Sequence, residues 1–158
     1  MTMTPAEARS AGFEAYMTEN CGGVTVEMFD VTEMEEDDIV AALREIVSGE
    51  DAPNAIFATN DVETLLAMRA VIRARASGEV QVFGFNATAD TLGAITAGQL
   101  NGVISPSGGS LGVAAIEAAA NFLSGEEIDN VLTLDPLVLN ADAIDAVRRP
   151  CLPNDPNC

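Results

Sequence analysis

Two asparagines follow the two most apolar strand-like segments of the chain. Asn60 comes after residues 55–59, and Asn86 comes after residues 80–85. Both segments are short, almost continuously apolar and followed by helix-forming sequence, which is typical of strands buried on both faces of a parallel sheet. Ligands of such sheets bind beyond the carboxyl ends of the strands. Because an amide donates and accepts hydrogen bonds, the two side chains together favour a ligand rich in hydroxyl groups.

Each asparagine also has a structural explanation when it is taken alone. Asn60 and Glu63 have the spacing of a helix N-cap and its partner, and Asn86 can open the turn before Thr88. A third polar residue, Arg9, lies in the first predicted helix. It is either a surface arginine or a planar guanidinium that donates hydrogen bonds to ligand hydroxyls.

The order of the predicted elements indicates an α/β fold. Helices are predicted over residues 4–20, 32–47, 60–76, 91–97, 109–123 and 141–147, and strands over 24–29, 55–59, 80–85, 102–105 and 131–134. This alternation predicts a three-layer, doubly wound and mostly parallel sheet. We expect residues 1–148 to form one lobe and residues 149–158 to form a loosely held tail.

The charge of the chain excludes some classes of partner. It carries 25 acidic residues, seven basic residues, all of them Arg, and no His, for a net charge of −18. Nucleic acid and anionic membranes would be repelled by such a surface. We interpret the acidic surface as solubilising, with recruitment of a basic partner as the alternative.

Neither catalysis nor metal binding is predicted. Residues 108–112 match the G-x-S-x-G pattern of a nucleophile elbow, but the histidine that would serve as base is absent. Without His or a C-x-x-C motif a zinc site is not expected, and without a phosphate-binding glycine motif no nucleotide cofactor is expected. The acidic residues Glu33, Glu35, Glu36, Asp37 and Asp38 fit the first turn of a helix. Cys151 and Cys158 close a short loop, and the sequence leaves open whether they form a disulfide.

Several segments together resemble a known family. Residues 9–13 (RSAGF), 55–61 (AIFATND) and 82–86 (VFGFN) resemble the R-x-x-G-F, A-I-F-A-x-N-D and V-x-G-F-D motifs of type I periplasmic sugar-binding proteins. Ribose- and galactose-type binding proteins and the ligand domains of lactose-repressor-type regulators belong to this group. Residues 98–100 and the helix that ends at residues 123–126 continue the resemblance, which extends from Arg9 to Val147.

The resemblance implies an incomplete two-lobe protein and a set of binding residues. The chain looks like the carboxyl-terminal half, with residues 105–135 as the crossing segment that in the family packs on the other lobe. Carried over by position, Arg9, Asn60 and Asn86 would contact sugar hydroxyls, with Asp61 in the same motif and Met34 where the family stacks an aromatic ring. Asn86 replaces the family's aspartate, so a charged acceptor becomes a neutral one.

The function implied by the resemblance is binding without chemistry. The chain would bind a sugar or polyol and serve an ABC permease through its full-length parent outside the cytoplasm, although residues 1–5 lack the features of a signal peptide. The alternatives are the ligand-sensing domain of a lactose-repressor-type regulator and, more remotely, a small α/β hydrolase. Two subunits could also form a homodimer by exchanging the helix at 109–123.

Overall fold

The computed structural model describes residues 3–106 and 108–148 of the chain. The predicted α/β class is confirmed, and the strands belong to a four-stranded, mostly parallel sheet. The chain divides into two compact units between Phe85 and Asn86. Within the described part of the chain, no helix is long and apolar enough to cross a membrane. The two units are described in turn.

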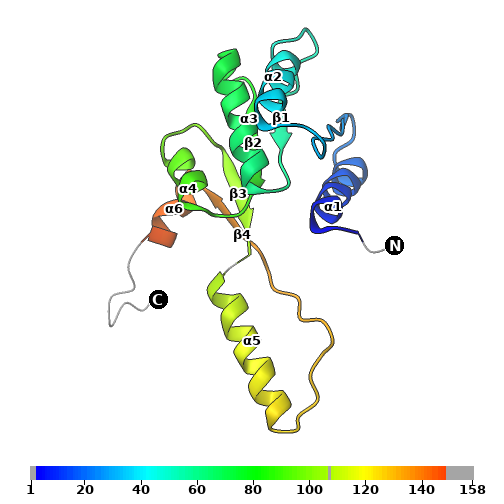
Figure 1. Ribbon diagram of the computed structural model, residues 1–158, viewed down its shortest axis with the longest axis vertical. Helices are drawn as coiled ribbons and strands as arrows, with labels where there is room; N and C mark the ends of the chain where they lie inside the picture. Colours follow the sequence, from blue (N-terminus) through cyan, green and yellow to red (C-terminus); the bar gives the residue numbers. More distant parts are fainter. Residues whose placement is uncertain (1–2, 107, 149–158) are drawn as a thin grey trace. The chain divides into compact units, whose positions relative to one another are not determined.

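The first unit contains a pair of parallel strands. Its elements are α1 (Pro5–Asn20), α2 (Glu36–Val47), β1 (Ala55–Phe57), α3 (Asp61–Ala74) and β2 (Gln81–Phe85) (Figure 1). In the register of β1 and β2, Ile56 lies opposite Val82. The N–H of Ala58 extends the pairing by donating to the carbonyl of Phe83 at 2.9 Å. Because the strands are parallel, their carboxyl ends meet at one edge of the sheet.

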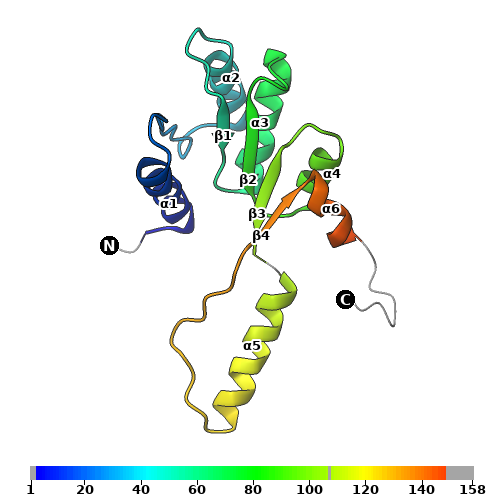
Figure 2. The same ribbon diagram turned by 180° about the vertical axis from the view of Figure 1, so that it is seen from behind.

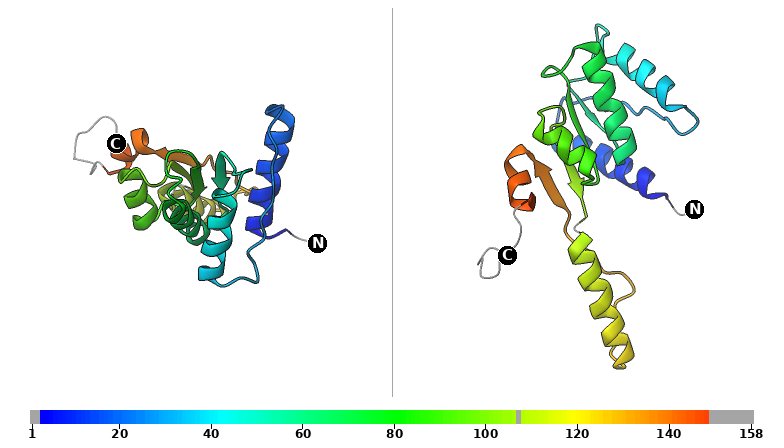
Figure 3. Two further views of the ribbon diagram at one scale, coloured as in Figure 1. Left: turned by 90° about the horizontal axis from the view of Figure 1, so that it is seen from above. Right: turned by 60° about the vertical axis from the view of Figure 1, so that its left-hand side comes forward.

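The core of the first unit lies between its helices and strands. Figures 1 and 3 show α2 alongside α3, and the two helices are in contact. In α2 the buried residues Val40, Leu43 and Val47 recur at helical spacing. In α3 the buried residues include Leu66 and Ala70. Each large aliphatic side chain buried here contributes about 1.5–3 kcal/mol.

One glycine sets how closely α3 approaches β2. A Cβ built on Gly84 would lie 2.6 Å from the Cβ of Thr64 and closer still to its Oγ1 and Cγ2. Thr64 is fully buried, its hydroxyl donates to the carbonyl of Asn60, and it accepts from the N–H of Phe85 at 3.4 Å. Because position 84 has no side chain, Thr64 of α3 can bond both to Asn60, which follows β1, and to Phe85, the last residue of β2.

The second unit contains an antiparallel pair of strands. Its elements are α4 (Ala89–Thr96), β3 (Gly102–Ser105), α5 (Gly108–Leu123), β4 (Leu137–Asn140) and α6 (Ala141–Arg148). In the register of β3 and β4, Ser105 lies opposite Leu137. The buried residues Ile95, Val103 and Ile144 bring α4, β3 and α6 into one core. Figure 2 shows α5 standing apart from the other elements of this unit.

Two predicted strands are wrong. Residues 24–29 form an extended loop in which Val24, Met28 and Phe29 are exposed. Residues 131–134 are also irregular, with Val131 and Leu132 exposed, and the strand of this region is β4, at 137–140. A short β-branched or apolar run becomes a strand only where a neighbouring strand offers its hydrogen bonds, and this condition is not local.

The predicted start of the second helix is also wrong. The N–H and hydroxyl of Thr32 both donate to the carboxylate of Asp30, at 2.9 and 2.6 Å, so Thr32 closes a turn and caps no helix. α2 begins four residues later, with Glu35 as its N-cap and without a side-chain cap. The predicted tail at 149–158, with Cys151 and Cys158, lies outside the described residues.

Candidate ligand-binding site

Arg9 joins the ends of both strands of the first unit. Its Nη1 donates to the carbonyl of Thr59 at 2.8 Å, just beyond the end of β1. Its guanidinium carbon lies 3.6 Å from the centre of the ring of Phe85, the last residue of β2. A cation stacked on an aromatic ring gains about 0.5–2 kcal/mol, depending on how far it is desolvated. The guanidinium is therefore held from two sides at the carboxyl edge of the pair.

In the part of the chain that the structure describes, no carboxylate neutralises the charge of Arg9. Among the residues that the structure describes, the salt bridge observed joins Arg69 and Glu36, and Arg9 has no acidic partner. Arg9 is half-buried, in a chain of net charge −18. One of its five N–H donors is used by Thr59, so the others can donate to a ligand. An arginine held in place but unpaired is suited to binding an oxygen-rich ligand.

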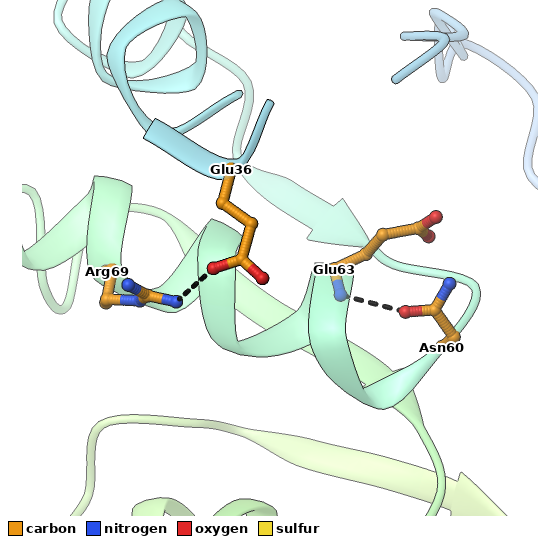
Figure 4. A network of polar contacts seen from close by, with 4 residues as sticks. All are labelled: Glu36, Asn60, Glu63 and Arg69. Carbon is orange, nitrogen blue, oxygen red and sulfur yellow. Dashed lines mark hydrogen bonds and ion pairs between the residues drawn. The ribbon is translucent and has the colours of Figure 1, made fainter. Parts of the chain in front are cut away.

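Asn60 has the capping role that the sequence suggests, with one donor group left over. Its Oδ1 accepts from the N–H of Glu63 at 2.8 Å, which caps α3 (Figure 4). Its Nδ2 points away from that bond in Figure 4, and in the described part of the chain it has no hydrogen-bond partner. Because Thr59 directly precedes Asn60, the contact of Arg9 with Thr59 brings both predicted binding residues to one place.

Glu63 binds Thr59 at the turn between β1 and α3, whereas the sequence predicts that it is the capping partner of Asn60. Its carboxylate accepts from the hydroxyl of Thr59 at 2.7 Å and from the N–H of Thr59 at 3.3 Å. A reciprocal capping box would instead direct it to the N–H of Asn60. Glu63 thus holds Thr59, whose carbonyl holds Arg9. It positions the guanidinium without touching it.

Aromatic rings attach α1 to the strands, and the sequence analysis missed this role. Phe13, one turn after Arg9, stacks on Phe57 of β1 with ring centres 4.9 Å apart and planes 15° from parallel. Phe85 supports the guanidinium of Arg9. Such pairs contribute about 0.5–1.5 kcal/mol beyond their buried area. The available signal was the spacing of Arg9 and Phe13, which places both on one face of a helix.

The start of α1 is fixed close to Arg9. Thr4 and Glu7 form a capping box, with the N–H of Thr4 donating to Glu7 at 2.6 Å and the N–H of Glu7 donating to the Thr4 hydroxyl at 3.2 Å. The backbone N–H of Thr4, and then its hydroxyl, hold the pKa of Glu7 below its ordinary value.

In the loop before α2, the hydroxyl and then the N–H of Thr32 similarly lower the pKa of Asp30.

Asn86 belongs to the second unit and has an uncommon backbone conformation. Its φ is +72°, in the left-handed region that asparagine tolerates better than most residues. Its N–H donates to the carbonyl of Ile104 and its carbonyl accepts from the hydroxyl of Thr91. The next N–H, of Ala87, donates to the hydroxyl of buried Ser105. The turn at Asn86 is therefore fixed within its own unit.

Met34 and Asp61 complete the set of predicted residues. Asp61 is the first residue of α3, where a carboxylate is favoured by the helix dipole. Met34 is half-buried in the loop before α2, and its N–H donates to the carbonyl of Val31. Of the five predicted residues, the structure links Arg9 with Asn60. Ligand contacts of all five residues stay predictions.

The G-x-S-x-G segment lies in the first turn of α5, where Ser110 is exposed. The chain contains no histidine to act as its base. Within residues 3–106 and 108–148, no group of three or more cysteine and acidic side chains is placed to hold a metal ion. The chemistry available at Arg9 and Asn60 is hydrogen-bond donation to a ligand.

A comparison with protein families gives the decisive match. Residues 1–127 match the family described as "Periplasmic binding protein domain". The chain belongs to this family. The resemblance seen in the sequence is thereby confirmed, and so is the expectation of a binding protein without catalytic activity, because the family and its solved members are solute-binding proteins. No sequence among curated proteins matches the chain.

Solved structures of similar fold include several sugar-binding proteins. A mutant XylFII–LytSN complex contains a chain that is 25% identical, with a TM-score of 0.77 over 89% of this chain and 55% of that one. A solute-binding protein of Actinobacillus succinogenes with bound D-allose is also 25% identical, with a TM-score of 0.62 over 71% of this chain and 40% of that one. An Agrobacterium vitis solute-binding protein bound to α-D-tagatopyranose is 19% identical, with a TM-score of 0.74 over 88% of this chain and 46% of that one.

The chain therefore spans about half the length of the solved proteins that it matches. The incomplete fold predicted from the sequence agrees with this coverage.

Proposed function

We propose that this chain supplies one side of a sugar-binding site in an extracytoplasmic solute-binding protein. The observation that carries the proposal is the half-buried guanidinium of Arg9, which is held against Phe85 and Thr59 and has no acidic partner among the described residues. The amide nitrogen of Asn60 is the second donor. Bound D-allose and tagatopyranose in similar structures support a sugar as the ligand.

The physical basis is the match between fixed donors and hydroxyl oxygens. A sugar hydroxyl accepts and donates hydrogen bonds, and a guanidinium offers several donors in one plane. Because Arg9 is already immobilised by Thr59 and Phe85, little side-chain entropy is lost when it binds. A hydrogen bond from a charged group contributes about 1.5–3 kcal/mol, whereas one from a neutral amide contributes about 0.5–1.5 kcal/mol. Arg9 should dominate the affinity.

Ligand-observed NMR with D-allose and D-arabinose tests the proposal, because it detects binding in the millimolar range that a one-sided site would give. Arg9→Ala is compared with Arg69→Ala, which removes the same charge from an exposed ion pair between α3 and α2. Asn60→Asp keeps a good N-cap while removing the amide donor.

We expect saturation transfer to at least one sugar from the unmodified chain. Arg9→Ala should weaken this binding by about 10- to 150-fold, the equivalent of one charged hydrogen bond. Arg69→Ala should leave it unchanged, and Asn60→Asp should weaken it only several-fold. Absence of transfer to either sugar, or equal losses in the two arginine variants, would contradict the proposal.

The physiological role proposed for the full-length parent is delivery of the sugar to an ABC permease. Two of the similar proteins are described as ABC transporter solute-binding proteins. The XylFII–LytSN complex shows that a protein of this fold also occurs in complex with another protein, which makes a protein partner other than a permease the alternative. Uptake of labelled sugar by cells with and without the intact parent gene separates them, since loss of uptake supports the importer role.

A further inference from the structure

Both groups that support the guanidinium of Arg9 are hydrogen-bonded to the start of α3. The carbonyl of Thr59 accepts from Arg9, and Thr59 in turn donates to the carboxylate of Glu63. The ring of Phe85 stacks on Arg9, and the N–H of Phe85 donates to the hydroxyl of Thr64 at 3.4 Å. Because Glu63 and Thr64 are consecutive residues, a single turn of one helix fixes both supports.

The hydroxyl of Thr64 also joins the two donors of the proposed site. It donates to the carbonyl of Asn60, whose amide is the second donor. It accepts from the backbone of Phe85, whose ring lies against Arg9. A hydroxyl has one proton to donate and lone pairs to accept, so it can make both bonds at once. The turn that carries Asn60 and the end of β2 are therefore fixed relative to one another by one oxygen atom.

The bond to Phe85 distinguishes Thr64 from an ordinary threonine in a helix. Such a threonine commonly donates to the carbonyl four residues earlier, as Thr96 of α4 does to Leu92. The carbonyl of Asn60 already accepts from the N–H of Thr64 at 3.0 Å. It is therefore satisfied without the hydroxyl, and what the hydroxyl adds is the connection from α3 to β2.

The N–H of Phe85 needs an acceptor because the strand pairing ends before it. In a strand, N–H groups two positions apart point to the same side, and that of Gln81 donates to the carbonyl of Asn54 in the direction of β1. β1 itself ends at Phe57. Thr64 supplies the acceptor for Phe85, and Thr64 is fully buried. Removal of its hydroxyl would leave a backbone N–H without this partner in a place that water does not readily reach.

We propose that Thr64 is a positioning residue of the sugar-binding site. Acting through Phe85, its hydroxyl sets where the guanidinium of Arg9 lies, and it fixes the turn of Asn60 at the same time. The inference rests on the proposed function, because it assigns to that site a residue that acts on the ligand through others. Gly84 is a condition for it, since a Cβ at that position would overlap with Oγ1 and Cγ2 of Thr64. Donors that are fixed before the ligand arrives lose less entropy on binding.

The variants Thr64→Val and Thr64→Ser separate the hydroxyl of this residue from its packing. Val keeps the branched shape and removes the hydroxyl, whereas Ser keeps the hydroxyl and removes the methyl group. Binding of D-allose and D-arabinose is measured by ligand-observed NMR on variants that circular dichroism shows to be folded. Thr64→Val should weaken binding about 3- to 10-fold, the equivalent of one hydrogen bond, and Thr64→Ser less than about twofold. Thr96→Val, which removes a bond of the same kind from α4, is the matched control and should leave binding unchanged.

The side chain of Arg9 gives a second readout that needs no sugar. Because the guanidinium lies over the ring of Phe85, the ring current moves the Nε–Hε proton signal of Arg9 upfield, and Arg9→Ala assigns that signal. Thr64→Val should return it toward the position of a free arginine, whereas Thr64→Ser should leave it in place.

Two results would overturn the inference. One is a loss of sugar binding in Thr64→Ser that equals or exceeds the loss in Thr64→Val, as expected if the residue only fills space. The other is an unchanged Arg9 signal in Thr64→Val. If the unmodified chain binds neither sugar, the proposed function fails, and the Arg9 signal still decides whether Thr64 positions the guanidinium.

Discussion

The substitution Gly84→Ala tests the closest approach in the first unit. The new methyl group would lie 2.6 Å from the Cβ of Thr64, closer than van der Waals contact, and would overlap with its hydroxyl and methyl. Thr64 is fully buried and sits between the carbonyl of Asn60 and the N–H of Phe85. Either α3 moves away from β2 or Thr64 leaves its hydrogen bonds.

The expected destabilisation combines two contributions. Overpacking by one methyl group costs about 1–3 kcal/mol in a well-packed core. Loss of the hydrogen bonds of Thr64 adds about 1 kcal/mol. For a chain of this size a loss of about 3 kcal/mol lowers the melting temperature by roughly 6–12 °C. That is a large part of the stability of an ordinary domain, about 5–15 kcal/mol.

Urea unfolding followed by circular dichroism measures the loss. Gly93→Ala is the matched control, because Gly93 lies within α4 and a Cβ there meets nothing within 4 Å. It should stabilise the protein by about 0.5–1 kcal/mol through helix propensity. The double variant Gly84→Ala/Thr64→Ala should recover part of the loss, since the hydroxyl and methyl of Thr64 are gone while its Cβ remains.

An unchanged midpoint for Gly84→Ala would refute the close packing of α3 on β2. So would a double variant that is destabilised by the sum of its two single changes, because residues in contact must couple. The hydroxyl of Thr64 also donates to the carbonyl of Asn60. Gly84→Ala should therefore weaken sugar binding even under conditions in which the variant is fully folded.

Three further changes probe the site and the helix that carries Arg9. Asn60→Ala should lower stability by about 1 kcal/mol through loss of the α3 cap, measured by urea unfolding, whereas Asn60→Asp should be nearly neutral. Glu63→Ala should cost about 1.5–3 kcal/mol in stability by releasing Thr59, and the same variant should weaken sugar binding because Thr59 holds Arg9. In an NMR pH titration the carboxyl carbon of Glu7 should change below about pH 4.5, its ordinary pKa. The lowered pKa means that its capping of α1 is complete above pH 4.5 and is lost as the pH falls through the folded-state pKa.

Each of these changes has its own control. Glu63→Gln keeps an acceptor for the hydroxyl of Thr59, so it should be milder than Glu63→Ala; equal effects would contradict this, because they would show that a neutral acceptor cannot replace the carboxylate. Arg69→Ala removes an exposed ion pair of 3.6 Å, drawn in Figure 4, and should cost no more than about 1 kcal/mol. A titration of Glu7 centred at or above pH 4.5 would contradict the capping box.

The elements that were predicted correctly depend on short-range features. The capping box of Thr4 and Glu7 marks the start of α1, and Asn60 marks the start of α3, because a cap bond joins residues three positions apart. Helical spacing of apolar residues predicts α2. The apolar runs at 55–57 and 81–85 become strands because each has a parallel partner in the other.

The predictions that failed required information from distant parts of the chain. Residues 24–29 and 131–134 have strand-like composition, but no strand pairs with them in the described part of the chain. Thr32 does not cap a helix, because its N–H donates to the carboxylate of Asp30, two residues earlier. The antiparallel pairing of β4 depends on the end of β3, more than thirty positions earlier in the chain.

By itself the sequence determined the α/β class, the family motifs and the candidates Arg9 and Asn60. The position of Arg9 beside Thr59, the residue before Asn60, was decided by tertiary structure, since Arg9 donates to a carbonyl fifty positions away and stacks on a ring at the end of another strand. Helix caps and the spacing of apolar residues involve positions within one or two helical turns, so they can be predicted from the sequence. The setting of a guanidinium depends on which distant backbone groups and rings the packing brings to it, and only the folded chain supplies them.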